Sequence, residues 1–232
     1  MKRDAQRKAA AEAAVSLVDS GMVVGLGTGS TAAYFIAALI RRVNEEGLDI
    51  TAIPTSVRSG QQALAGGIHL VTFETVRTVD ITVDGADQIL RGSLDLVKGL
   101  GGALLREKIV AAASKRLIII ADSSKLVDRL GGEIPVPVEV VKFGWETTAA
   151  RIEKLGGVPV RRWPEDSEQP FQTDSGNFIL DCAFPALNEP ADLEKALSNT
   201  IGVVESGLFI GMAHTAFVAN ASGVDILNRA TS

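Results

Sequence analysis

A glycine-rich stretch near the middle of the 232-residue chain combines residues that could bind an anion with residues that could move a proton. Residues 98–108, KGLGGALLREK, place Lys98 ahead of three glycines and a helix-forming segment that carries Glu107. A glycine turn at the start of a helix exposes backbone N–H groups and the positive end of the helix dipole, and anions bind there. A carboxylate just inside such a helix can act as a general acid or base. The alternative for Glu107 is a surface residue paired with Arg106 or Lys108.

A second glycine-rich stretch, residues 27–31 (GTGST), offers hydroxyl groups as well as backbone N–H groups. With Ala32 it fits G-x-G-x-x-A, a fingerprint of dinucleotide-binding proteins, and Asp49 follows about 20 residues later. A carboxylate that binds a ribose belongs at the end of the second strand, whereas Asp49 precedes the apolar part of that strand. The stretch therefore favours a terminal phosphate over a nicotinamide cofactor, although a turn that only packs a strand on a helix is a simpler alternative. The phosphate-binding groups would come from Thr28, Gly29, Ser30 and Thr31.

Two carboxylates and another lysine also follow predicted strands. Asp84 and Asp87 lie in the sequence DGAD, where they flank Gly85 and Ala86. Asp-Gly turns are common, so this motif alone is weak, but two carboxylates near Glu107 can hold sugar hydroxyls or move protons. Lys98 and Lys125 each lie at a strand end beside a glycine or serine turn. This position favours a role for both lysines in binding an anion or a developing oxyanion.

A parallel α/β sheet would bring these residues together. Apolar runs read as strands alternate with helical segments, beginning with a helix at 3–19, and the pattern extends to about residue 131. A polar motif follows each of five predicted strands, at 22–26, 49–53, 79–83, 94–97 and 117–121. Ligands of open parallel sheets bind outside the carboxyl ends of the strands. The five loops GTGST, PTS, DGAD, KGLGG and DSSK therefore predict a single pocket.

The pattern changes near Gly131 to the order β-α-β-β-α-β, the split ferredoxin-like motif. We predict strands at 135–141, 158–161, 177–182 and 202–205, helices at 146–155 and 190–198, and a loop at 163–176. Two prolines in the first of these strands suggest that it lies at an edge. The predicted domains are a parallel α/β domain at 1–131 and 207–232 and a ferredoxin-like α+β domain at 132–206. We expect the apolar run 207–213 to return to the first sheet.

Composition excludes several classes of function. The net charge of −5 gives no support for binding to nucleic acid or to an anionic membrane. The N-terminus lacks the apolar core of a signal peptide, no run is long enough to span a membrane, and a cytoplasmic location is the default. Cys182 lies in a predicted strand, where a buried inert thiol is expected. One cysteine and two distant histidines, His69 and His214, give no metal-ligand spacing, so no metal site is expected and both histidines are read as structural.

The chain resembles the type A ribose-5-phosphate isomerases in blocks that follow the family's order and span nearly its whole length. The block KGLGGALLREK is the most specific, whereas GTGST recurs in related sugar-phosphate proteins. The other blocks are IPTS (53–56), VDGADQ (83–88), IADSSK (120–125), PVPVEV (135–140), KLGG (154–157), TDSGNFILD (173–181) and IGVVESGLF (201–209).

The resemblance implies a Rossmann-like domain with an inserted ferredoxin-like domain, a homo-oligomer (dimer or tetramer), no cofactor and no metal. It implies interconversion of D-ribose 5-phosphate and D-ribulose 5-phosphate in the non-oxidative branch of the pentose phosphate pathway. Glu107 would carry a proton between C1 and C2 through an enediolate, and Lys98 would stabilise the enediolate oxygen. Asp84 and Asp87 would contact the sugar and help to open the ring or move hydroxyl protons. The remaining substrate-binding residues would be Thr28 to Thr31, Gly85, Ala86, Gly99, Leu100, Gly101 and Lys125.

Two further residues need separate mention within this resemblance. Leu100 stands where many family members have Gly or Arg, so the resemblance implies no role for its side chain. Lys8, in the predicted first helix, is a candidate phosphate ligand.

Rival interpretations predict other features. A sugar-phosphate sensor would bind without turnover, but such regulators need a DNA-binding helix-turn-helix with a basic face, and the segment before the first strand is too short for one. Aminosugar-phosphate deaminases and acyl-CoA transferases on a similar scaffold are not expected to carry KGLGGALLREK. Activity on other aldose phosphates, such as allose 6-phosphate, stays open.

Overall fold

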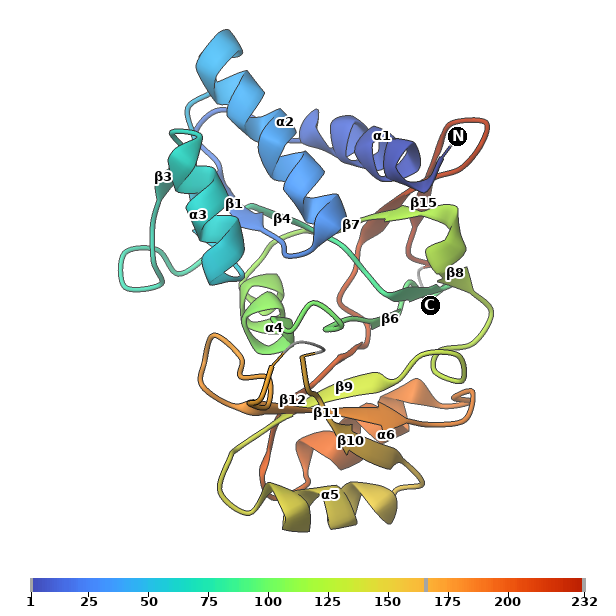
Figure 1. The fold of residues 1–232 in the computed structure, drawn as a ribbon. Helices are drawn as coiled ribbons and strands as arrows, with labels where there is room; N and C mark the ends of the chain where they lie inside the picture. Colours follow the sequence, from blue (N-terminus) through green and yellow to red (C-terminus); the bar gives the residue numbers. More distant parts are fainter. Residues whose placement is uncertain (1, 165–166, 231–232) are drawn as a thin grey trace.

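The computed structural model describes residues 2–164 and 167–230, which form a mixed α/β fold (Figure 1). Its largest sheet, hereafter the main sheet, has seven strands in the order β15-β14-β7-β4-β1-β2-β3. All of its strands run parallel except β15, which pairs antiparallel with β14 at one edge. The strands are β1 (Val23–Leu26), β2 (Thr51–Pro54), β3 (His69–Leu70), β4 (Ile81–Asp84), β7 (Leu117–Asp122), β14 (Thr215–Ala219) and β15 (Val224–Asn228).

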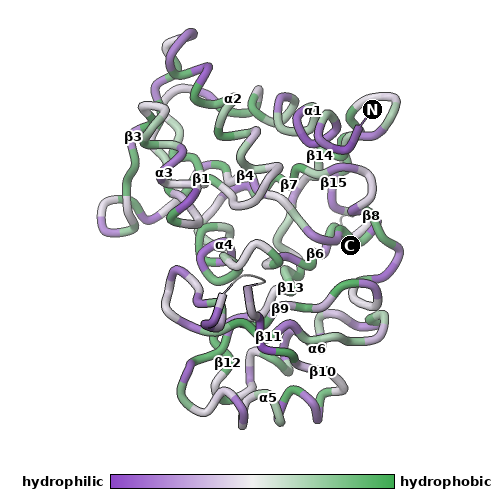
Figure 2. Tube along the Cα trace, viewed as in Figure 1, coloured by the Kyte–Doolittle hydropathy of each residue, from purple (hydrophilic) through white to green (hydrophobic). Residues whose placement is uncertain are grey.

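Helices on both faces of the main sheet explain why its strands are so apolar. Helices α1 (Arg3–Val15), α2 (Ser30–Glu46) and α3 (Val57–Ala65) lie on one face, and α4 (Leu104–Ala112) lies on the other (Figure 1). All six residues of β7 are buried, as expected for a strand covered on both sides. In the hydropathy view, green segments follow the strands between these helices (Figure 2).

The amphipathic pattern of α2 fixes its packing on the main sheet. Phe35, Ile36 and Leu39 recur at helical spacing and are fully buried. The helix begins directly after Gly29 and ends at Gly47, whose left-handed backbone (φ 70°) stops the helix without the strain that a side chain would add. The start of α2 therefore lies at the carboxyl end of β1.

Residues 136–206, hereafter the small lobe, form the four-stranded antiparallel sheet β10-β11-β9-β12 with α5 (Trp145–Glu153) and α6 (Pro190–Ser198). The strands are β9 (Val136–Val140), β10 (Val158–Arg161), β11 (Phe178–Ala183) and β12 (Val203–Ser206). The predicted β-α-β-β-α-β order is confirmed. The division into domains at 131/132 and 206/207 stays a prediction.

The predicted edge position of the proline-rich strand is wrong, because β9 lies between β11 and β12. Pro137 is tolerated there for a local reason. It lies one residue beyond Val138, the last residue of β9 that pairs with β12. At this point β12 has ended, and the Pro137 carbonyl accepts a hydrogen bond from the N–H of Gly207 at 2.7 Å. The missing N–H of Pro137 therefore interrupts no ladder with β12.

The run 207–213 does not return to the main sheet as predicted. Only Leu208–Phe209 form a strand, β13, and it joins a separate sheet in the order β13-β6-β5-β8. The partners are β5 (Gln88–Leu90), β6 (Leu96–Val97) and β8 (Leu126–Val127). The chain re-enters the main sheet one segment later through β14, which pairs with β7. In this third sheet β6 pairs with β5 and β13, which fixes the strand from which the glycine turn 98–102 starts.

Other element boundaries differ by small amounts. Helix α1 ends at Val15 rather than near residue 19. The predicted loop 163–176 contains no helix or strand in its described part, and residues 165–166 lie outside the described residues. None of the helices in 2–164 and 167–230 is long and apolar enough to cross a membrane.

Candidate active site

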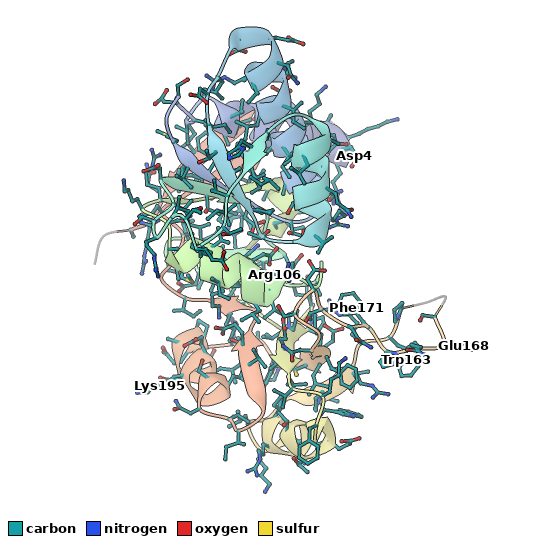
Figure 3. The ribbon with its side chains drawn as sticks, turned by 90° about the vertical axis from the view of Figure 1, so that its left-hand side faces the viewer. Asp4, Arg106, Trp163, Glu168, Phe171 and Lys195 are labelled. Carbon is teal, nitrogen blue, oxygen red and sulfur yellow. The ribbon has the colours of Figure 1, made fainter. Side chains whose placement is uncertain are left out.

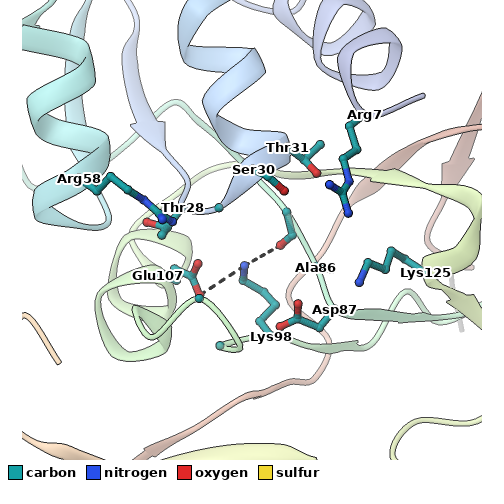
Figure 4. Close-up of a pocket in the computed structure, with 14 residues that line it drawn as sticks. Arg7, Thr28, Ser30, Thr31, Arg58, Ala86, Asp87, Lys98, Glu107 and Lys125 are labelled. Carbon is teal, nitrogen blue, oxygen red and sulfur yellow. Dashed lines mark hydrogen bonds and ion pairs between the residues drawn. The ribbon is translucent and has the colours of Figure 1, made fainter. Parts of the chain in front are cut away.

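A pocket of about 290 Å³ lies at the carboxyl ends of β1, β4, β6 and β7 (Figure 4). Twelve residues predicted from the sequence line it: Thr28, Gly29, Ser30, Thr31, Gly85, Ala86, Asp87, Lys98, Gly99, Gly101, Glu107 and Lys125. Two further predicted residues, Asp84 and Leu100, do not line the pocket but contact residues that do. Four of the five predicted loops therefore meet at this pocket. The fifth, PTS (54–56), does not line it, although Thr55 and Ser56 form hydrogen bonds with Thr28.

Lys98 is the centre of this site. Its side chain is 3% exposed, and its ammonium Nζ lies 3.0 Å from Oδ2 of Asp84 and 3.4 Å from Oε2 of Glu107. The same ammonium donates a hydrogen bond to the backbone carbonyl of Gly85 at 2.6 Å. Dashed lines in Figure 4 mark its contacts with Gly85 and Glu107. One buried cation is thus held between two buried carboxylates.

Asp84 is fixed from several sides. Its Oδ1 accepts hydrogen bonds from the N–H groups of Thr28, at 3.0 Å, and Gly85, at 2.7 Å. Gly27 makes this close approach possible, because a Cβ at that position would lie 2.2 Å from Oδ1 of Asp84. With Oδ1 bound to the backbone and Oδ2 facing Lys98, Asp84 orients the ammonium group.

Glu107 occupies the first turn of α4 and is 3% exposed. Its Oε2 has no hydrogen-bond partner among the described residues, which is costly for a buried oxygen unless something else binds there. Burial raises the pKa of Glu107 to about 8; the nearby Lys98 opposes this shift, and the charges of Asp84 and Asp87 add to it. A carboxyl group with such a pKa can take up and release a proton near neutral pH.

The environment of Lys98 and Asp84 keeps the Lys98 side chain protonated. Burial would lower the pKa of Lys98, but the adjacent Asp84 and Glu107 outweigh burial and raise it. Burial also raises the pKa of Asp84, and Lys98 and the two backbone N–H groups limit that rise. Lys98 is therefore a permanent cation beside a carboxyl group that titrates.

The turn after β6 shapes the floor of the pocket. Gly99 has φ 100° and Gly102 has φ 83°, backbone conformations that favour glycine. Between them, the N–H of Leu100 donates to Oδ2 of Asp87 at 2.9 Å, while the side chain of Leu100 is 39% exposed. Leu100 thus contributes its backbone to the site by holding Asp87.

The opposite end of the pocket is positively charged. Ser30 and Thr31 open α2, so the unpaired N–H groups of its first turn face the pocket beside their hydroxyls. Arg7 from α1 and Lys125 from the 3₁₀ turn Ser123–Lys125 line the same end (Figure 4). Asp122, 2% exposed, lies 3.3 Å from Nε of Arg7 and orients that guanidinium. Backbone dipole and side-chain charges there favour an anion.

Arg7 and Arg58 line the pocket but were not expected to do so. Both belong to helices, whereas the sequence argument looked for polar residues directly after strands. Lys8, the predicted phosphate ligand in α1, is exposed and does not line the pocket; its neighbour Arg7 does. Neighbouring residues of a helix point about 100° apart, so Arg7 and Lys8 face different directions.

Asp49, Cys182 and His214 lie where the sequence predicts them. Asp49 lies before β2, so it is not at the strand end where a dinucleotide-binding carboxylate would lie. Cys182 is fully buried, and burial raises the pKa of its thiol. His214 accepts a hydrogen bond from the N–H of Leu117 at 3.1 Å, which is a structural role. Within residues 2–164 and 167–230, no group of three or more His, Cys, Asp or Glu is placed to hold a metal ion.

Comparison with known proteins gives a consistent result across sequence and structure. Residues 51–223 match the family model for ribose 5-phosphate isomerase A (phosphoriboisomerase A). A ribose-5-phosphate isomerase A of Synechococcus is 52% identical over 226 residues, which cover 97% of this chain and 98% of the relative. The corresponding protein of Gloeobacter violaceus is 53% identical over 227 residues, covering 98% of this chain and 97% of the relative.

Solved structures agree. Ribose 5-phosphate isomerase A from Methanocaldococcus jannaschii is 39% identical, has a TM-score of 0.93, and the match covers 97% of this chain and 99% of that one. A D-ribose-5-phosphate isomerase in complex with phospho-erythronic acid is 36% identical and has a TM-score of 0.95. The match covers 99% of this chain and 100% of that one. The matches to these relatives and structures extend over nearly the whole chain. The chain therefore belongs to the ribose 5-phosphate isomerase A family.

Proposed function

We propose that the protein interconverts D-ribose 5-phosphate and D-ribulose 5-phosphate. One observation carries the proposal: Lys98 is buried between Asp84 and Glu107 at one end of a pocket whose other end is cationic. A phosphosugar has the matching distribution of charge, with a permanent anion at C5 and a transient anion at the carbonyl end during isomerisation. The pocket is at the small end of the range for small-molecule sites, which suits a pentose phosphate.

The phosphate would bind at the start of α2. The hydroxyl and N–H groups of Ser30 and Thr31 can donate to its oxygens, and Arg7 and Lys125 can balance its charge. Binding there leaves the carbonyl end of the open-chain sugar facing Lys98 and Glu107. Thr28 and Gly29 would line the path between the two ends.

Glu107 would carry the proton that distinguishes aldose from ketose. As a carboxylate it removes the proton from C2 of the open-chain aldose, and the electron pair of that C–H bond moves into a C1–C2 double bond while the carbonyl oxygen becomes negative. The protonated Glu107 then returns the proton to C1, and the hydroxyl proton on O2 moves to O1. No atom or electron is gained or lost. General base catalysis of this kind is worth roughly 10²–10⁴-fold.

Lys98 would stabilise the negative oxygen of the enediolate. Its charge is already held in place before reaction, so little reorganisation is needed when the oxyanion forms. Asp87 would contact sugar hydroxyls, assisted by the N–H groups of the Gly99–Gly101 turn. Asp84, buried behind Lys98, would act on the sugar through that lysine.

A related structure supports the assignment of the two ends. It is a complex of a D-ribose-5-phosphate isomerase with phospho-erythronic acid. This compound combines a phosphate with a carboxylic acid, so it offers one anion for each end of the pocket. In the present chain, the start of α2 and Lys98 are the two places that could receive them.

A ketose assay tests the proposal. We expect purified protein to convert ribose 5-phosphate to a ketose in the presence of EDTA, because proton transfer by Glu107 beside Lys98 needs no metal ion. Tight binding without turnover would favour the sugar-phosphate sensor instead. Loss of activity in EDTA that added metal restores would contradict the metal-free mechanism.

We further propose a cytoplasmic homo-oligomer, a dimer or a tetramer, with a phosphosugar as its small-molecule partner. The single cysteine, buried in β11, suits a reducing compartment. Phe143 is 96% exposed and Ile201 is 76% exposed, and apolar side chains this open support an interface between copies. Sedimentation equilibrium would give the number of subunits.

A further inference from the structure

We propose that Asp174, in the turn 173–176 of the small lobe, is a positioning residue for the isomerisation. It holds the start of α3 and the start of α4 together and thereby fixes two walls of the active site relative to each other. This inference rests on the proposed function. It gives a role to the TDSGN part of the sequence, which lies outside the pocket.

The turn that carries Asp174 is anchored to the small lobe by a buried acid. Glu139 of β9 is 1% exposed, and its Oε1 accepts hydrogen bonds from Oγ1 of Thr173 and Nδ2 of Asn177, both at 2.9 Å. The N–H of Asn177 donates to Oγ1 of Thr173 at 3.2 Å, and the N–H of Gly176 donates to the Thr173 carbonyl at 2.8 Å. Asp174 therefore projects from a turn with a defined shape.

Asp174 contacts two helices that belong to the main sheet. Its Oδ2 accepts a hydrogen bond at 2.7 Å from the N–H of Val57, the first residue of α3. That N–H has no partner within the helix, and a negative charge is favourable at a helix start. The backbone carbonyl of Asp174 accepts a hydrogen bond from Nη2 of Arg106 at 2.8 Å, and Nη1 of Arg106 lies 3.7 Å from Oδ2. Figure 3 shows Arg106 on α4 above the loops of the small lobe that carry Phe171.

Both helix starts reach the pocket. On α3, Oγ of Ser56 accepts a hydrogen bond from Oγ1 of Thr28 at 2.8 Å, and Arg58 lines the pocket beside Thr28 (Figure 4). On α4, Arg106 immediately precedes Glu107. A shift of α3 relative to α4 would therefore change the distance between the Thr28–Arg58 wall and the base. Displacements of this kind, of about 1 Å, can cost up to roughly 10² in rate.

The solvent exposure of Asp174 and Arg106 distinguishes a positioning role in catalysis from a role in global stability. The side chain of Asp174 is 33% exposed and that of Arg106 is 38% exposed. Ion pairs this open to solvent contribute little to global stability. If Asp174 acts through geometry, its loss should change turnover much more than the melting temperature.

The test replaces Asp174 with alanine and measures kcat, KM and melting temperature. We expect kcat to fall roughly tenfold with little change in melting temperature, because Glu107 and the opposite wall lose their fixed spacing. Asp174→Asn keeps a side-chain oxygen that can accept from the N–H of Val57, so it should recover part of the turnover that Asp174→Ala loses. Asp192→Ala removes an exposed acid from α6 of the same lobe and should match wild type.

A double-mutant cycle and hydrogen exchange complete the test. Arg106→Ala should also lower kcat. The double variant Asp174→Ala/Arg106→Ala should lose less than the two separate effects combined, because the two side chains share the ion pair between Nη1 of Arg106 and Oδ2 of Asp174 at 3.7 Å. Amide exchange at residues 57–60 and 104–108 should be faster in Asp174→Ala. Unchanged kcat in Asp174→Ala would overturn the inference, as would a loss fully explained by unfolding. An inactive wild type would refute the proposed function instead, and exchange alone would then decide whether Asp174 holds the two helices.

Discussion

Glu107 illustrates how burial turns an ordinary carboxyl group into a usable base. Burial in the first turn of α4 raises the pKa of this group, and Lys98 at 3.4 Å limits the rise. The pKa of about 8 places the group where uptake and release of a proton are both accessible. In the proposed mechanism Lys98 serves two purposes, because the same charge that limits the pKa of Glu107 would stabilise the enediolate.

The pH dependence of turnover follows from this pKa. Only the carboxylate form of Glu107 can accept the C2 proton, so kcat/KM should fall about tenfold per pH unit below the pKa and level off above it. Since the pKa of Glu107 is about 8, the bend should appear near that pH. The measurement is kcat/KM for ribose 5-phosphate from about pH 6.5 to about pH 9. A flat profile across this range would contradict the titration assigned to Glu107.

At the scale of elements, the site depends on two glycine turns that meet from opposite sides. The turn after β1 presents the start of α2 to the pocket, and the turn after β6 presents Lys98 and leads into α4. Between them, β1 and β4 approach so closely that Gly27 contacts the side chain of Asp84. The position of Lys98 therefore depends on a contact between strands as well as on its own neighbours.

Gly27→Ala tests that contact. The added methyl group would lie 2.2 Å from Oδ1 and 2.6 Å from Cα of Asp84, so Asp84 must move and its hold on Lys98 must weaken. We expect a loss of at least about tenfold in kcat, comparable to the lower range for removing an oxyanion-stabilising group. The assay is steady-state turnover, with circular dichroism to show that the fold is retained. Wild-type kcat in a folded Gly27→Ala protein would mean that Asp84 does not need its present position.

At the scale of the whole molecule, the active site costs stability. Glu107 has an ordinary pKa of 4.5 when exposed and about 8 in the folded protein, so the folded state binds its proton more tightly. Between these two pH values the unfolded state releases the proton and the folded state keeps it. The free energy of unfolding should therefore decrease as pH rises through this window, and the full penalty applies above about pH 8.

Glu107→Gln should relieve that penalty. The variant has no proton to lose at this position, so its free energy of unfolding should exceed that of wild type at about pH 9 by at least about 1.4 kcal/mol, the equivalent of one pKa unit. The difference should shrink as pH falls toward 4.5. Urea unfolding of both proteins at high and low pH measures it. Equal stability at high pH would show that burial of Glu107 is not penalised.

Much of the fold and of the candidate site can be predicted from the sequence, for a physical reason. Polar loops that follow apolar strands must meet at one edge of a parallel sheet, and this reasoning located Asp87, Lys98 and Glu107. The order of elements in the small lobe followed from the alternation of strand and helix patterns. A buried run such as β7 is apolar because both of its faces are covered.

The features that were missed depend on tertiary context. The segments 207–213 and 215–219 are about equally apolar, yet only the second joins the main sheet, where it pairs with β7. Pro137 suggested an edge, but the neighbouring strand ends beside it. Arg7 and Arg58 reach the pocket from helices, and nothing in their local sequence shows which side of a helix will face a ligand.

The kcat of Glu107→Gln for ribose 5-phosphate tests the central claim most directly. Glutamine keeps the size of the side chain but cannot accept the C2 proton, while the phosphate-binding end of the pocket is untouched. We predict that kcat falls by roughly 10²–10⁴-fold, the range for loss of a general base, with KM little changed. A kcat near that of wild type would remove Glu107 from the mechanism and contradict its role as the base that moves the C2 proton.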